Sequence, residues 1–470
     1  MDQDDIELAW LPDLVYTGGR FESGMALVCD AAGRITRLAR ASEVEGKRVV
    51  RLKGRAVLPG LVNAHSHAFQ RVIRGRTEYR TGKGSDNFWT WREMMYSAAT
   101  RLSPEDLYDA SRMTFLEMAL NGITSVGEFH YIHRAPDGSS YDDPNLLSKT
   151  VMRAARDVGL KICLLRVAYA RSGYASNPNS KQIRFIEADA ESFLGNVERL
   201  RAEAGKEDTE AAWVGVAPHS VRAVPLDYLR ELFRYAQEYE LPVHMHIAEQ
   251  PAEIEACIKE YDRTPVALLE TEGLLTERFT GVHGIHVTAE EARMLALARA
   301  IICACPTTER NLGDGIVPAS LFFKEGVRVS LGTDSHTQVD LFEDARELEY
   351  NMRLAKLERV VLDRTSDSPS ALAASLFDCA TRHGAESIGI TGGGILATGQ
   401  PADFFTVDLH HPSIAGASIE DLLAHIVFSL SPAAVREVVV GGRMIVESGH
   451  HRAEREIIEK FISLQKRLWS

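Results

Sequence analysis

The sequence lacks any hydrophobic run long enough to cross a bilayer, and it lacks the cysteine pairs of a disulfide or zinc-ribbon framework. Its start, Met1 to Asp5, has neither the basic nor the apolar region of a signal peptide. The six cysteines include no C-x-x-C pair, and we expect reduced, mostly buried thiols. These absences argue against a membrane-spanning or secreted protein and predict a cytoplasmic one.

Positive charge is the scarcer sign. The chain has 53 Lys and Arg against 66 Asp and Glu, which gives a formal net charge of −13. Such a balance argues against nucleic acid or an anionic membrane as the main partner. We therefore expect a small-molecule partner.

Eight apolar, β-branched runs alternate with helical patterns, as in a barrel of parallel strands whose active site lies at their carboxyl ends. The runs cover residues 56–64, 123–129, 161–169, 213–219, 242–247, 279–285, 300–305 and 327–332. One connecting helix has clear boundaries, because Ser103 can cap it, Pro104 suits its first turn and Gly122 ends it. The pattern predicts an α/β fold, a (β/α)8 TIM barrel.

The chain is longer than a bare barrel of roughly 250 residues, and the surplus lies at both ends. Short strand-like segments separated by glycine turns occur there, so we expect a small β-sandwich domain built from both termini. The expected division is 1–57 for the first part of this domain, 58–390 for the barrel, and 391–470 for its second part with a terminal helix.

Two histidines separated by one residue, His65 and His67, directly follow the first apolar run. Strand side chains alternate, so both project to one side and could bind one cation. Two histidines on one strand face can also be ordinary polar residues at a sheet rim. The reason to prefer metal ligands is that His246 and His283 lie near the ends of two other runs and Asp334 follows a third.

A single Zn²⁺ bound by His65, His67, His246 and Asp334 would lower the pKa of a bound water from near 16 toward about 7. Asp334 could then accept a proton, Glu249 could carry it to a departing nitrogen, and His283 could hold or polarise the nucleophile. Alone, Asp334 could be a helix cap and Glu249 a solvated acid. Because both residues lie at the ends of predicted strands, as the histidines do, we favour the catalytic interpretation.

This pattern of His-x-His, two further histidines and an aspartate resembles the amidohydrolase superfamily, and the segment from Gly399 to Phe404 fits its small sandwich domain. The His-x-His-x-x-Glu run from His244 to Glu249 looks like the deaminase branch. Where two-metal members usually have a bridging lysine, this chain has Ala217-Pro218-His219. The resemblance implies a hydrolase with one zinc ion per chain, and a homodimer.

Five segments (67–71, 87–96, 129–131, 217–222 and 305–315) are similar to family members that convert N-formimino-L-glutamate to N-formyl-L-glutamate and ammonia during histidine degradation. The resemblance implies that substrate contacts come from Gln70, Arg92, Tyr131, His219 and Arg222. The chain departs from this group at 172–176, where a glycine-rich turn is expected, so the role of that loop stays open.

Two carboxylates on the substrate would be repelled by a protein of net charge −13 unless fixed cations stood in the pocket. Arg92 and Arg222 suit this role, because a guanidinium can bind a carboxylate through two hydrogen bonds. Both could instead be surface arginines. The segment holding Trp89, Trp91 and Met94 to Met95 is interpreted as a loop that covers the barrel mouth, with a packed helix face as the alternative.

Other functions remain compatible with these motifs. A guanine, adenosine or triazine deaminase of the same branch would share the metal ligands, but its pocket would favour flat aromatic contacts over two arginines. A formimidoyl hydrolase acting on the same dicarboxylate would yield glutamate and formamide. A binding or assembly protein on this fold would have lost metal ligands, and none of the expected ligands is missing here.

Overall fold

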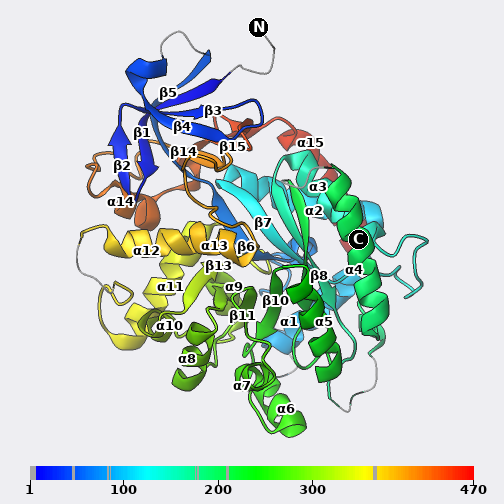
Figure 1. The fold of residues 1–470 in the computed structure, drawn as a ribbon. Helices are drawn as coiled ribbons and strands as arrows, with labels where there is room; N and C mark the ends of the chain where they lie inside the picture. Colours follow the sequence, from blue (N-terminus) through cyan, green and yellow to red (C-terminus); the bar gives the residue numbers. More distant parts are fainter. Residues whose placement is uncertain are drawn as a thin grey trace.

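Two β-sheets organise the chain, a parallel sheet of eight strands and a mixed sheet of nine (Figure 1). The computed structural model describes residues 7–44, 48–81, 84, 86–174, 176, 179–207, 211–363 and 368–470. The parallel sheet curls into a nearly closed barrel, and strands from both ends of the chain form the mixed sheet. The predicted fold class is therefore confirmed. Met1 to Asp5, used above to argue against a signal peptide, lie outside the described residues.

The barrel strands follow one another in chain order around the sheet. They are β6 (Leu61–Ser66), β7 (Ile123–His130), β8 (Lys161–Ala168), β9 (Ala212–Pro218), β10 (Val243–Ile247), β11 (Phe279–His283), β12 (Ile301–Ala304) and β13 (Arg328–Leu331). The barrel closes where Asp334 N donates to His65 O at 3.0 Å and His67 N donates to Asp334 O at 3.1 Å. Closure therefore brings residues 65–67 and Asp334 together at the carboxyl ends of the strands.

Helices connect the strands and surround the barrel (Figure 1). They are α1 (Phe88–Ala99), α2 (Pro104–Leu120), α3 (Leu146–Val158), α4 (Ala190–Glu207), α5 (Leu226–Glu238), α6 (Pro251–Tyr261), α7 (Pro265–Thr271), α8 (Ala289–Leu297), α9 (Pro306–Leu312), α10 (Ala319–Glu325), α11 (Leu341–Lys356), α12 (Ala371–Ala380) and α13 (Arg382–Ser387). The predicted limits of α2 are confirmed: Ser103 caps it, Pro104 opens it, and Gly122 follows with φ +81°.

The mixed sheet joins the two ends of the chain. Its strands are β1 (Leu8–Thr17), β2 (Arg20–Ser23), β3 (Met25–Cys29), β4 (Ile35–Arg40), β5 (Arg48–Pro59), β14 (Phe404–Asp408), β15 (Val435–Val440), β16 (Arg443–Glu447) and β17 (His450–His451). At its centre β5 is parallel to β1 and antiparallel to β14. Helix α14 (Leu422–Ser429) precedes β15, and α15 (Glu454–Trp469) contacts α2.

The predicted first barrel strand, 56–64, is wrong in its limits. Ala56 to Pro59 belong to β5 of the mixed sheet, and the barrel strand β6 begins at Leu61. Gly60 separates them at a point where a Cβ atom would lie 2.2 Å from the Oγ1 atom of Thr124. Both strands are buried and apolar, so their periodicity does not reveal the change of sheet. The other seven predicted runs overlap barrel strands.

All six cysteines are buried and free, as predicted. Among the residues that the structure describes, no helix combines the length and the apolar character needed to cross a membrane.

Candidate active site

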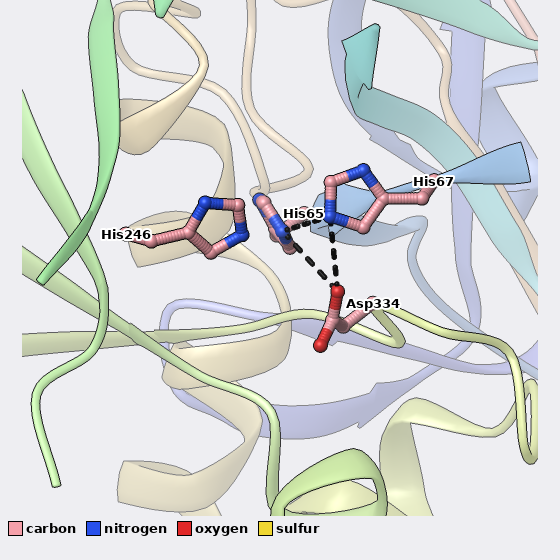
Figure 2. Close-up of side chains that lie close together, drawn as sticks. All are labelled: His65, His67, His246 and Asp334. Atoms are coloured by element: carbon pink, nitrogen blue, oxygen red, sulfur yellow. Dashed lines mark hydrogen bonds and ion pairs between the residues drawn. The ribbon is translucent and has the colours of Figure 1, made fainter. Parts of the chain in front are cut away.

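Four buried side chains converge at the carboxyl end of the barrel (Figure 2). His65 comes from β6, His67 directly follows that strand, His246 comes from β10, and Asp334 from the turn after β13. Their candidate ligand atoms all lie within 4.8 Å of one another. Asp334 Oδ1 is 3.4 Å from His65 Nε2 and 3.2 Å from His67 Nε2. The four residues form a buried metal site, and they are the four expected from the sequence.

The hydrogen bonds of the imidazoles test whether a cation fits. His67 Nδ1 lies 2.9 Å from Phe129 O, and His246 Nδ1 lies 3.1 Å from His219 O. A carbonyl only accepts, so each Nδ1 carries the proton and each Nε2 presents a lone pair to the centre. Burial lowers the pKa of His65 to about 3, which favours its neutral form. His65 Nε2 lies 3.1 Å from His67 Nε2 and 3.4 Å from Asp334 Oδ1, so nitrogen and carboxylate donors converge at the spacing of ligands to one ion and the donor set fits a metal.

The backbone around the site is strained. Ala248, His283, Asp334 and His336 have φ values of +50°, +75°, +44° and +59°. Residues other than glycine in this left-handed region cost roughly 1–3 kcal/mol each, and such residues cluster at functional sites. Here they follow or end β10, β11 and β13, at the end of the barrel where the metal site lies, and His283 and Asp334 line its pocket.

Glu249 and His283 flank the metal site. His283 Nε2 lies 3.7 Å from Glu249 Oε1 and 3.9 Å from Asp334 Oδ2. Burial raises the pKa of Glu249 to about 8, with Asp314 and Asp334 adding to the effect and His283 opposing it. Burial disfavours a charged His283, but the carboxylates of Glu249, Glu309 and Asp334 outweigh it and raise its pKa. Glu249 can therefore exchange a proton near neutral pH, while the carboxylates around His283 favour its charged form.

The substrate contacts expected from the sequence line one pocket together with the metal site. This pocket includes Gln70, Arg92, Tyr131, His219 and Arg222, and also His67, His246, Glu249, His283 and Asp334. Gln70 Nε2 donates to the Tyr131 hydroxyl at 2.8 Å, while Gln70 Oε1 is buried without a partner among the described residues.

Arg92 holds unused hydrogen-bond donors. Its guanidinium lies over the Trp89 ring, 4.3 Å from the centroid, and near the Tyr96 ring. Its Nε and Nη1 atoms are buried and have no hydrogen-bond partner in the described part of the chain. Arg222 Nη1 donates to Ser172 O at 3.3 Å, and Arg222 lines the same pocket. Two cationic groups are thus available to an anionic ligand.

The segment interpreted as a loop over the barrel mouth is helix α1, so that interpretation is wrong in its secondary structure. Asn87 caps the helix, with Thr90 completing the capping box. Trp91, Arg92 and Met95 from α1 line the pocket. The helix therefore covers one side of the site, and the side chains that it packs toward the barrel also line the pocket.

The open question of residues 172–176 is answered in part. Ser172 contacts Arg222 through its carbonyl and donates from its hydroxyl to Gln182 Oε1 at 2.5 Å. Ala175 lies outside the described residues.

Sequence reasoning missed two buried carboxylates near the site. Glu128 Oε1 accepts from Ala68 N at 2.7 Å, and Glu128 Oε2 accepts from Ser66 Oγ at 2.5 Å. Glu309 Oε1 lies 3.1 Å from His283 Nδ1. In the sequence, each of these residues is a single acid inside or just after an apolar run. That position indicates that the carboxylate is buried, but it does not identify its hydrogen-bond partner.

Comparisons with known proteins agree with this geometry. A model of the amidohydrolase family matches residues 56–445. Formimidoylglutamate deiminase from Pseudomonas aeruginosa is 38% identical over 87% of this chain and 89% of its own length. An amidohydrolase from Brucella melitensis superposes with a TM-score of 0.90 at 32% identity, covering 98% of this chain and all of its own. An adenosine deaminase from Xanthomonas campestris with bound zinc has the same fold, with a TM-score of 0.82 at 19% identity and 99% coverage of both chains.

Proposed function

The chain belongs to the amidohydrolase family, and from this premise we propose that it hydrolyses N-formimino-L-glutamate to N-formyl-L-glutamate and ammonia, a step of histidine degradation. The observation that carries the proposal is the pair Arg92 and Arg222 in the pocket of the metal site. Two guanidiniums match two carboxylates, and a neutral substrate would leave both unpaired. The similarity to the Pseudomonas aeruginosa deiminase supports the same substrate.

The metal proposed for this site is one Zn²⁺ per chain, held by His65, His67, His246 and Asp334. Three imidazoles and a carboxylate are a typical zinc ligand set. When bound, zinc supplies Lewis acidity and lowers the pKa of a water molecule. The zinc-containing adenosine deaminase of the same fold supports this choice.

The chain's own residues bind and orient the substrate. Arg92 and Arg222 bind the two carboxylates, so the formimino group points toward the metal site. Gln70, Tyr131 and His219 lie beside that group, and the unpartnered Gln70 Oε1 can accept a hydrogen bond from an amidine N–H. The buried Tyr96 ring and the half-buried rings of Phe88 and Trp91 line the pocket and limit the access of water, which strengthens the charge pairing.

Two carboxyl groups move the protons. Asp334 accepts a proton from the attacking water, and a C–O bond forms at the formimino carbon. With the amidine protonated, attack turns its C=N bond into a single bond. Glu249 then delivers a proton to the terminal nitrogen, the C–N bond breaks and ammonia leaves, while the hydroxyl proton of the adduct passes to Glu249 as the formyl C=O bond forms. Asp334 releases its proton to solvent. His283, with Nε2 facing both carboxylates, holds the nucleophile between them. The product keeps its inner nitrogen as a formamide.

A second candidate is deamination of an aminoheterocycle. Trp91, Tyr96 and Phe185 in the pocket could stack on a flat ring. That substrate, however, gives the two guanidiniums no anionic partner. The third possibility, a formimidoyl hydrolase, would require protonation of the inner nitrogen rather than the terminal one.

The test is a product analysis. The zinc-loaded protein is incubated with formiminoglutamate and, separately, with guanine, adenosine and an aminotriazine, while ammonia is assayed and the other product is identified by NMR. We expect ammonia and formylglutamate in equal amounts from the first substrate. Formamide and glutamate, or faster turnover of an aminoheterocycle, would overturn the proposal.

A further inference from the structure

Glu309 lies behind His283, on the side away from the metal site. It sits on α9, and its Oε1 atom is 3.1 Å from His283 Nδ1 and accepts from Cys305 N at 2.8 Å. The side chains of Glu309 and His283 are only 2% and 1% exposed. This buried contact takes no part in the proton transfers described above.

The two ring nitrogens of His283 have different environments. Nδ1 faces Glu309, while Nε2 faces Glu249 and Asp334 at 3.7 and 3.9 Å. An ionised carboxylate only accepts hydrogen bonds, so Nδ1 carries a proton and the ring cannot turn over without losing this bond. The positive φ of His283 fixes the backbone from which the ring projects.

Glu309 is not explained as a helix cap. In a capping box the acid stands at the third helical position and pairs with a serine or threonine cap. Here the cap residue is Cys305, whose side chain makes no capping bond, and Glu309 stands at the fourth position. The capping boxes of α2 and α8 follow the usual pattern, with Asp106 and Glu291 at the third position. The position of Glu309 therefore suits a different purpose.

A cation behind His283 is the main alternative, because Cys305 Sγ lies within 4.8 Å of the Glu309 and His283 donor atoms. Glu309 Oε1 already accepts from Cys305 N at 2.8 Å and lies 3.1 Å from His283 Nδ1, and the Cys305 thiol lies 3.9 Å from Cys303 O, to which it can donate. A hydrogen bond accounts for the arrangement without an ion.

We propose that Glu309 is a positioning residue, which accepts a hydrogen bond from Nδ1 and fixes the orientation of the His283 ring so that Nε2 faces the reacting water. This inference rests on the proposed function, because it assigns His283 a place beside the nucleophile. Outer carboxylates that orient catalytic or ligating histidines typically contribute about ten- to a hundredfold in activity.

The test compares Glu309→Ala and Glu309→Gln with a matched control, Glu291→Ala. Glu291 is also a buried acid near a helix start, but it bonds to Thr264 and Thr288. In the zinc-loaded full chain, Glu309→Ala should lower kcat about ten- to a hundredfold with little change in KM. Glu309→Gln should recover much of this loss, because its amide oxygen can accept from Nδ1. Glu291→Ala should lower the melting temperature and leave kcat unchanged.

A second readout needs no substrate. With ¹⁵N-histidine labelling, the Nδ1 proton signal of His283, assigned by its absence in His283→Gln, should disappear in Glu309→Ala and move upfield in Glu309→Gln. If Glu309→Ala does not fold, the Gln variant still decides the question. The inference would be overturned if the Nδ1 proton signal were unchanged in the Glu309 variants. It would also be overturned if Glu309→Ala kept the wild-type kcat at full zinc content, or if its loss of kcat were explained by loss of zinc. If the wild-type protein does not turn over formiminoglutamate, the proposed function fails while the NMR result still judges Glu309.

Discussion

The hydroxyl oxygen of Ser66 lies 3.1 Å from Nε2 of His336, across the seam where β6 meets the turn after β13. The contact belongs to a buried chain of hydrogen bonds. Asn63 donates to Thr333 Oγ1, which bonds to His336 Nδ1. His336 Nε2 bonds to Ser66, and Ser66 bonds to Glu128, which also accepts from Ala68 N. Glu128 thereby holds both chain neighbours of the metal ligand His67. The closing seam and the metal site are stabilised by the same bonds.

The first prediction concerns Glu128, whose pKa is raised to about 8 by burial from an ordinary value of 4.5. Between these values the folded chain keeps a proton that the unfolded chain has released, so the contribution of Glu128 to stability falls as pH rises. Glu128→Gln mimics the protonated form. Relative to this variant, the metal-free wild type should lose up to about 1.4 kcal/mol of unfolding free energy per pH unit from pH 5 to 7. Parallel denaturation curves across that range would contradict the prediction.

The second prediction concerns the metal. Elemental analysis of the purified chain should give one zinc per chain, and His246→Ala should lose it, because one of the three imidazoles is then missing. His244→Gln provides the control: His244 lies two residues earlier on β10, is equally buried, and bonds to Ser387 O at 2.7 Å instead. Two equivalents required for full activity, or activity unaffected by exhaustive chelation, would refute the one-zinc proposal.

The third prediction concerns the proton-transfer groups. Glu249→Gln and Asp334→Asn should lower kcat about a hundred- to ten-thousandfold, much more than they weaken substrate binding, because each removes a positioned acid or base. Asp334 is also a proposed ligand, so its loss should be the larger. Rates are measured after zinc content has been restored. A wild-type rate in Glu249→Gln would exclude its role as proton carrier.

The fourth prediction concerns the two pocket arginines. Arg92→Met and Arg222→Met should each lower kcat/KM for formiminoglutamate about ten- to over a hundredfold, since a hydrogen bond to a charged group contributes roughly 1.5–3 kcal/mol. Arg80→Met, an exposed arginine on the segment before α1, removes the same charge outside the pocket and should have little effect.

An analogue whose side-chain carboxylate is an amide separates the two arginines. It already lacks the anionic partner of one of them, so one Met variant should lose much less activity on the analogue than on the true substrate. Equal losses for both variants on both compounds would mean that neither arginine recognises that carboxylate.

The sequence was enough to predict the metal ligands, because their position follows from a general rule of parallel barrels. Buried parallel strands are continuous apolar runs, and ligands at their carboxyl ends must meet, so His65, His67, His246 and Asp334 could be grouped before their distances were known. The same rule failed at Gly60, because an apolar run does not say which sheet it joins. It failed also at α1, where glycines and large rings near Trp89 suggested a loop although Asn87 and Thr90 form a helix start.

Glu128 and Glu309 were beyond the reach of the sequence for another reason. Each is a single acid whose partner is far away in the chain, 62 residues for Ser66 and 26 for His283. No spacing links such pairs until the barrel closes, and an isolated glutamate is most often solvated. Tertiary structure alone identifies their partners.

The path of β5 into β6 has a consequence for how the protein is made. One edge of β5 pairs with β1, which is synthesised before it. The other edge pairs with β14, which is synthesised only after all the barrel strands. During synthesis this edge of β5 is an open template on which a second nascent chain could add a strand. Gly60 then joins that unfinished sheet directly to β6, which bears His65, so a pairing that can form only after the whole barrel has been synthesised anchors the first barrel strand.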